Sequence, residues 1–241
     1  MGDPEAIQRV TEIIRSRLSE SPAVVVSAVA KTTDELVSFS DAASADSSRA
    51  DDLIDWIFER HVKLIADLGL EGDPVLSGVL SRAASDLTEL RRKFKEAGKA
   101  ELILMDLCLS TGEFLSSNIL VSYLNSQGIE AVWADARELI VTDSRFGCAR
   151  PLFSESQALA SRFFEPVLKA SKVAVMQGFV GSDVRGRTTT FGRGGSDYSA
   201  TFLGALLGAK TVEIWTDVDG ILTADPSLVP EARRIRRMSF E

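Results

Sequence analysis

The 241-residue sequence has few of the residues that mark several classes of protein. Two cysteines, Cys108 and Cys148, are too few for a disulfide scaffold and indicate a reducing compartment. The single histidine, His61, lies between Arg60 and Lys63 on a predicted helix, where we expect a surface position. A His-based catalytic triad or zinc site is therefore excluded.

Positive charge and long apolar runs are also scarce. There are 27 Lys and Arg against 35 Asp and Glu, a net charge of -8, which argues against nucleic acid as a partner. The one basic cluster, Arg233–Arg237, is expected on a solvated surface helix. No segment reaches the roughly 18 apolar residues that span a bilayer, so no membrane partner is expected. The first residues match neither a signal peptide nor a myristoylation pattern, which predicts a cytoplasmic protein.

Apolar patterns along the chain indicate strands that alternate with helices. Asp3 before Pro4 marks a helix start, and residues 38–48 are predicted as a surface loop or frayed helix. Predicted strands cover 23–28, 131–133, 139–141, 172–176 and 211–215, and 102–105 is a strand or the start of the next helix. Predicted helices cover 50–68, 74–97, 113–127, 156–169 and 198–207. The alternation predicts an α/β protein, a three-layer αβα sandwich with a mainly parallel central sheet.

Ligands of such sheets bind at the carboxyl ends of the strands. This rule indicates residues 29–33, residues 179–197, residues 216–220 and the start of a helix expected near Gly112 and Glu113.

The segment Gly192–Asp197 carries the most specific pattern of the four. Adjacent glycines let the backbone approach a ligand, and Ser196 or Asp197 is expected to cap the helix that follows. The helix N-terminus favours anions, and Arg193 adds a planar fork for a carboxylate or phosphate. The same residues also fit an ordinary tight turn before a capped helix, so both interpretations stay open.

The other segments also have two interpretations each. Glu113 either recognises a substrate ammonium or complements the dipole of a first helical turn. Residues 31–34 suit phosphate or carboxylate contact, or a helix cap. Asp217 and Asp219 suit ribose hydroxyls or magnesium, or a plain turn. Residues 185–190 suit phosphate contact or a solvated β-hairpin.

Five stretches follow one another in an order that is itself informative. They are Ser27–Val37 (SAVAKTTDELV), Thr111–Ser117 (TGEFLSS), Asp143–Gly147 (DSRFG), Gln177–Thr201 (QGFVGSDVRGRTTTFGRGGSDYSAT) and Glu213–Pro226 (EIWTDVDGILTADP). Together they resemble the catalytic domain of aspartate kinases, in the amino acid kinase family. The resemblance implies transfer of the ATP γ-phosphoryl group to the β-carboxylate of L-aspartate, which gives 4-phospho-L-aspartate and begins lysine, threonine and methionine synthesis. It implies ATP with Mg2+ as cofactors and no metal held by the protein alone.

The resemblance also implies roles for individual residues. Those implied to hold aspartate are Thr33, Glu113, Arg193, Gly194, Gly195 and Ser196. Asp197 is implied to orient the catalytic lysines. Those implied to lie at the nucleotide are Thr216, Asp217, Leu222 and Ser227, the last two at positions where many relatives carry Tyr and Arg.

Three features of the family fall outside the sequence. The family's Lys-Phe-Gly-Gly strand would precede Met1, and a second phosphate-side lysine and the regulatory ACT domains would follow Glu241. We therefore expect residues 1–241 to be a catalytic domain incomplete at both ends, with the first strand missing and activity impaired.

Two other functions remain open alongside aspartate kinase. One is a non-catalytic aspartate-binding subunit or pseudokinase, which the absence of the lysines favours. The other is a kinase of the same fold for another amino acid, such as glutamate or acetylglutamate. The presence of RGGSDY together with TGE argues against this second alternative. The sequence leaves homo-oligomer formation open.

Overall fold

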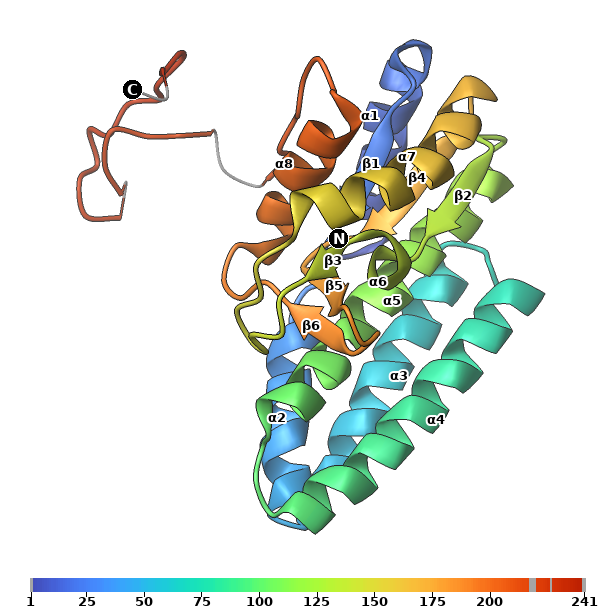
Figure 1. Ribbon diagram of the computed structural model, residues 1–241. Coiled ribbons are helices and arrows are strands. Elements are labelled where there is room, and N and C mark those ends of the chain that lie inside the picture. The colour runs from blue at the N-terminus through green and yellow to red at the C-terminus, as the bar shows by residue number, and fades with distance from the viewer. Residues whose placement is uncertain (1, 217–219, 226, 240–241) are drawn as a thin grey trace. The chain divides into compact units, whose positions relative to one another are not determined.

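A parallel three-stranded sheet with helices on both faces organises most of the protein (Figure 1). The computed structural model describes residues 2–216, 220–225 and 227–239. The chain divides into two units, Met1–Lys210 and Thr211–Glu241, and the helices and strands named below all lie in the first.

The elements follow the predicted alternation closely. The helices are α1 (Pro4–Arg17), α2 (Thr32–Ser44), α3 (Arg49–Asp67), α4 (Pro74–Ala97), α5 (Leu102–Ser126), α6 (Ala136–Leu139), α7 (Phe153–Lys169) and α8 (Gly195–Leu207), with a 3-10 turn at Leu18–Glu20. The strands are β1 (Ala23–Val26), β2 (Ala131–Ala134), β3 (Val141–Thr142), β4 (Val173–Gln177), β5 (Val180–Asp183) and β6 (Thr188–Thr190). The Asp3 carboxylate accepts from the Ala6 N–H at 2.7 Å, which confirms the predicted start of α1.

Strand β4 is the centre of the main sheet, whose order is β1-β4-β2. Both neighbours run parallel to β4, with Val26 opposite Gln177 and Ala134 opposite Met176. The carboxyl ends of all three strands therefore meet at one edge.

Alternate residues of β4 face the two helical layers, as the pleat of a strand requires. Val173 and Val175 pack into a cluster with α1 and α5, whereas Ala174 and Met176 pack with α7 and α8. Burial on both faces explains the continuous apolar run of this strand. The predicted three-layer αβα architecture is confirmed.

Helix α5 connects the sheet to a further layer of helices. Its first half packs with α2, α3 and α4, where the rings of Phe39 and Phe94 meet edge to face at 6.2 Å. Residues 110–120 are buried without interruption, so α5 is a core helix rather than an amphipathic one. None of the described helices has the length and apolar character needed to cross a membrane.

A hairpin leads from the main sheet toward α8. Strands β5 and β6 are antiparallel, with Val180 opposite Thr190, and β3 pairs parallel to β5. The buried Asp183 carboxylate accepts from the Arg187 guanidinium at 2.6 Å and from the Arg185 N–H at 3.0 Å. The hairpin interpretation of residues 185–190 is confirmed, but Thr189 and Thr190 are buried and not solvated.

Three local predictions in the first unit were wrong. Helix α5 begins at Leu102, which confirms the second of the two interpretations of 102–105, so the helix predicted to start at 113 starts earlier and Glu113 lies in its middle, not in its first turn. Residues 38–44 belong to α2, where Phe39 and Ser40 are buried, and 139–141 divides between α6 and β3. Because α5 is buried on every side over residues 110–120, its sequence has no periodicity that would mark where it starts.

The surface position predicted for His61 was also wrong, since its side chain is fully buried in α3. Its Nδ1 lies 2.7 Å from the Ile57 carbonyl, and its Nε2 has no partner in the described part of the chain. Burial lowers the pKa of the imidazole, and the Ile57 carbonyl opposes that shift. Residues adjacent in sequence point to different sides of a helix, so flanking charges do not report on the face that His61 occupies.

The second unit has no helix or strand among its described residues. The strand predicted over 211–215 and the surface helix predicted at Arg233–Arg237 were therefore wrong. Leu222 and Arg234 form an isolated antiparallel bridge instead. A strand needs a neighbour to take its backbone hydrogen bonds, and residues 211–216 pair with none of the described strands.

Candidate functional site

Three segments meet where β1 and β4 end. The Gly178 N–H donates to the Val26 carbonyl at 2.8 Å, which extends the β1–β4 pairing past the last strand residue. The Ser116 hydroxyl of α5 donates to the Ser27 carbonyl at 2.7 Å. The chain that leaves β1 is thus held between α5 and the chain that leaves β4.

Glu113 is the most unusual side chain in this region. Only 3% of the residue is exposed, and the backbone N–H of Ala28 donates to the carboxylate. Its Oε2 is buried and has no hydrogen-bond partner among the residues that the structure describes. Burial raises the pKa of this carboxyl to about 8, although the Ala28 N–H favours the charged form. A carboxylate in such a place is stabilised by a cationic ligand.

Gly112 explains how α5 comes close enough for this contact. A Cβ at Gly112 would lie 3.0 Å from the Ala28 Cβ and 3.3 Å from the Thr32 Cγ2. The Thr32 hydroxyl is buried without a partner among the described residues, and Thr33 follows it, half-buried, in the first turn of α2. The N-terminus of α2 therefore lies against the α5 residue that precedes Glu113.

The glycine-rich turn forms the other side of the site. Gly192 and Gly194 have positive φ values of 75° and 72°, which favour glycine, and Gly194 is the N-cap of α8. The expectation that Ser196 or Asp197 caps this helix was wrong, because the left-handed turn places both inside its first turn. The free N–H groups of a helix N-terminus remain available to an anion.

Close packing joins the turn to the end of the sheet. A Cβ at Gly178 would lie 2.8 Å from the Ser196 Cβ, and a Cβ at Gly195 would lie 2.5 Å from the Phe179 ring. Arg193 is exposed and forms no ion pair with another residue that the structure describes. Its guanidinium is therefore free for a carboxylate or phosphate.

The structure brings together some of the predicted site residues. Glu113, Thr33, Gly195 and Ser196 lie around the chain segments that leave β1 and β4, with Arg193, Gly194 and Asp197 on the turn and first helical turn beside them. Thr216, Leu222 and Ser227 lie in the second unit. There the Ser227 hydroxyl and N–H both donate to Asp225, and Asp217 lies outside the described residues.

Sequence reasoning missed two buried polar residues near the strand ends. Gln177 ends β4, where its amide donates to Asp135 at 2.9 Å and its Oε1 has no partner within residues 2–216, 220–225 and 227–239. Asp106 of α5 accepts hydrogen bonds from Gly147 and Thr190. A polar side chain at the end of an apolar strand was a usable signal for Gln177, whereas Asp106 sits in an apolar helix with no local motif.

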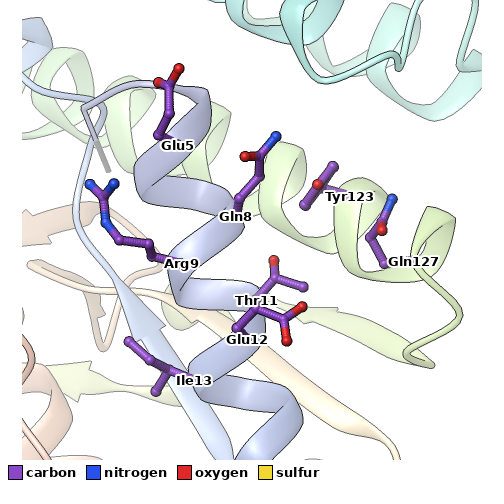
Figure 2. Close-up of a pocket in the computed structure, with 8 residues that line it drawn as sticks. All are labelled: Glu5, Gln8, Arg9, Thr11, Glu12, Ile13, Tyr123 and Gln127. Atoms are coloured by element: carbon purple, nitrogen blue, oxygen red, sulfur yellow. The ribbon is translucent and has the colours of Figure 1, made fainter.

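A separate hollow lies between α1 and the last turns of α5 (Figure 2). Of the residues that line it, only Thr11 and Tyr123 are buried, and the Thr11 hydroxyl already donates to the Ile7 carbonyl. Tyr123 is ten residues past Glu113, about 15 Å along a helix. The hollow offers surface groups and not a buried binding group, so the candidate site is at the strand ends.

The arrangement at the strand ends suits a small ligand with charges of both signs. The buried Glu113 carboxylate is placed for an ammonium, while the N-terminus of α8 and the Arg193 guanidinium are placed for carboxylate or phosphate oxygens. An amino acid with a second acidic group has these features.

The chain is similar to known proteins in family, in sequence and in structure. The model of the amino acid kinase family matches residues 1–241. Lysine-sensitive aspartokinase 3 of Escherichia coli is 35% identical over 240 residues, which cover all of this chain and 52% of that protein. The bifunctional aspartokinase/homoserine dehydrogenase 2 of Arabidopsis thaliana chloroplasts is 34% identical, with all of this chain and 26% of that protein covered.

Solved structures show the same likeness. Aspartokinase III of E. coli in complex with aspartate and ADP (R-state) matches with a TM-score of 0.86 at 34% identity, covering 97% of this chain and 51% of that one. Its T-state complex with lysine and aspartate matches with a TM-score of 0.83. The chain thus spans about half the length of the bacterial relative and about a quarter of the plant one.

Proposed function

The chain belongs to the amino acid kinase family, and from this premise we propose that it is an aspartate kinase, which phosphorylates the β-carboxylate of L-aspartate with ATP. Aspartokinases of about 35% identity that align with the whole chain support the proposal. A related structure in complex with aspartate and ADP supports this pair of ligands. The product would be 4-phospho-L-aspartate.

The observation that carries the proposal is the unpaired Oε2 of Glu113, buried where the strands end. A substrate ammonium at this oxygen would neutralise a carboxylate that burial otherwise protonates. L-Aspartate brings one ammonium and two carboxylates, so one carboxylate can be held while the other reacts.

The remaining residues of the first unit take complementary roles. Arg193 would hold a carboxylate through its planar fork, and the N–H groups of Gly194 and Ser196 would add donors at the start of α8. The Gly195 N–H already donates to the Gly192 carbonyl at 3.0 Å, so Gly195 would line the substrate without donating to it. Thr33 would contact the substrate from the first turn of α2. Asp197, which is exposed in the first turn of α8, would orient the lysines that the family resemblance implies.

The nucleotide is proposed to lie at Thr216, Asp217, Leu222 and Ser227. Mg2+ would come with the phosphates of ATP, as it usually does in phosphoryl transfer, and is not assigned a cage of protein ligands.

The reaction requires no covalent bond between the protein and the substrates. An oxygen of the β-carboxylate attacks the γ-phosphorus, the bond to the bridging oxygen breaks, and ADP leaves with that electron pair. The nucleophile is already ionised at neutral pH, so no general base is needed. Positioning of the two anions and neutralisation of their charge carry the rate enhancement.

The direct test is to trap the acyl phosphate with hydroxylamine. The 241-residue protein is incubated with ATP, Mg2+ and a panel of L-aspartate, L-glutamate and N-acetyl-L-glutamate, and hydroxamate is measured. We expect product with L-aspartate above all, and its loss in Arg193→Ala. Preferred turnover of another acid would assign a different kinase of this fold, and aspartate binding without hydroxamate would assign a non-catalytic subunit.

A further inference from the structure

Asp106 is a buried carboxylate to which the proposed reaction assigns no role. It is fully buried on α5, seven residues before Glu113. Seven residues make about two helical turns, so both side chains lie on nearly the same side of the helix. Helix α5 therefore carries two buried carboxylates in line, one of which has a free oxygen.

Donors from a loop and from the end of strand β6 converge on Asp106. The Gly147 N–H lies 3.0 Å from Oδ1 and 2.9 Å from Oδ2. The Thr190 N–H donates to Oδ2 at 3.0 Å, and the Thr190 hydroxyl donates to Oδ1 at 2.6 Å. Hydrogen bonds from three donors satisfy the carboxylate without a cation, so it is held firmly in place.

The segments that contain Thr190 and Gly147 both adjoin the turn that carries Arg193. Thr190 is the last residue of β6, two positions before Gly192. Gly147 supports the same turn from the side, because a Cβ at Gly192 would lie 3.0 Å from the Gly147 carbonyl oxygen. Asp106 thus fixes the entry to the glycine-rich turn and also the segment against which the turn rests.

We propose that Asp106 is a positioning residue, which holds the Arg193 turn at the distance from Glu113 that one small amino-dicarboxylic acid requires. The inference rests on the proposed function, since it takes Glu113 and Arg193 as ligands of the two ends of the substrate. Glu113 is on α5. Arg193 is on a turn whose connection to α5 runs through the hydrogen bonds of Asp106. A rigid connection matters because binding groups must keep their geometry to within about 0.5 Å.

The test compares Asp106→Asn with the parent protein. The amide keeps the shape of the side chain but faces the same donors with one oxygen fewer. We expect the KM and Kd for L-aspartate to rise about 10-fold or more, because small misplacements of binding groups have large effects, while the KM for ATP changes by less than about twofold. A role in stability alone would lower Tm without this difference between the two substrates.

Thr190 supplies a second pair of variants. Thr190→Val removes the hydroxyl donor, and Thr190→Ser keeps it. We expect the KM for L-aspartate to rise in the first and to stay near the parent value in the second. If Asp106→Asn does not fold, this pair carries the test. Asp183→Asn is the matched control, since Asp183 is also a buried carboxylate bound to backbone N–H groups, and its carboxylate accepts from Ser144, Arg185 and Arg187 rather than from residues 190–195.

Hydrogen exchange separates this inference from the proposed function. We expect faster exchange of the amides of residues 190–195 in Asp106→Asn than in the parent. Parent-like exchange there, or parent-like affinity for L-aspartate, overturns the inference and leaves the proposed function intact if the parent phosphorylates L-aspartate. A parent that neither binds nor phosphorylates L-aspartate overturns both.

Discussion

Glu113 shows how one residue can be costly for the fold and useful for binding. Its carboxylate is buried in the middle of a core helix, one oxygen has no partner, and burial raises its pKa to about 8. At neutral pH the free protein must hold either an unpaired charge or an extra proton there, and both destabilise it. A bound ammonium would relieve that penalty, so the same feature favours the complex.

Glu113→Gln is expected to weaken recognition of the substrate amino group. The amide keeps the shape of the side chain but removes the charge, and charge-assisted hydrogen bonds contribute about 1.5–3 kcal/mol. We expect the KM for L-aspartate to rise about 10- to 100-fold in initial-rate assays. Glu130→Gln, a change at an exposed carboxylate paired with Lys172, is the control and should leave the KM unchanged. An unaltered KM in Glu113→Gln would contradict this assignment of Glu113.

The raised pKa of Glu113 also predicts how stability depends on pH. Between the ordinary value of 4.5 and about 8, the folded protein keeps a proton that the unfolded chain has released. The free energy of unfolding should therefore fall as pH rises through this window, by about 1.4 kcal/mol per pH unit. Urea unfolding at pH 5.5 and pH 7.5 should show a loss of roughly 2–3 kcal/mol relative to Glu113→Gln. Parallel pH profiles for the two proteins would rule out this titration.

At the scale of elements, two glycines control how closely helices approach the ends of the strands. Gly112 lets α5 reach the chain after β1, and Gly178 lets the start of α8 reach the end of β4. Neither has a positive φ, so the requirement comes from close packing and not from backbone conformation. The distance between α5 and α8 at the site depends on these contacts.

Gly178→Ala should move α8 away from the sheet. Its Cβ would meet the Ser196 Cβ at 2.8 Å and the Ser196 Cα at 2.9 Å, and backbone atoms yield less easily than side chains. We expect unfolding by urea to show a loss of about 1–3 kcal/mol, with weaker L-aspartate binding. Gly78→Ala is the matched control, because Gly78 lies on α4 and a methyl group there would have nothing within 4 Å. That change should raise stability by up to about 1 kcal/mol. Equal effects of the two substitutions would contradict the close-packing explanation.

At the scale of the molecule, the two units differ in their content of helices, strands and buried apolar side chains. Met1–Lys210 contains the three hydrophobic clusters, the sheets and the helices, whereas the described part of Thr211–Glu241 has one isolated bridge. Apolar side chains of the second unit are exposed, including Trp215 at 60% and Leu228 at 81%. Segments with few buried contacts open most readily.

Brief trypsin treatment should therefore cut the second unit first. Its exposed arginines include Arg233, Arg234, Arg236 and Arg237, and Lys210 marks the boundary. Mass spectrometry should detect a product that ends near Lys210, with the circular dichroism and Tm of the parent. Early cleavage at exposed arginines of α4, such as Arg92, would contradict this division of the chain.

Local patterns in the sequence were sufficient to predict most of the elements and part of the site. The Asp3–Pro4 cap, the periodicity of α3 and α4 and the apolar run of β4 depend on neighbouring residues, and all were predicted correctly. Glu113 and the glycine-rich turn stand out in the same way, because their motifs are contiguous. Their roles in binding stay predictions.

Contacts between distant residues decided everything else. The burial of His61, the start of α5 and the absence of a strand at 211–215 depend on which surfaces meet, and periodicity does not reveal partners. Asp106 is the clearest case, since its donors are 41 and 84 residues away in the chain. A hydrogen bond across that separation forms only when the sheet and its helices have packed. The residues next to Asp106 in the sequence therefore do not indicate its partners.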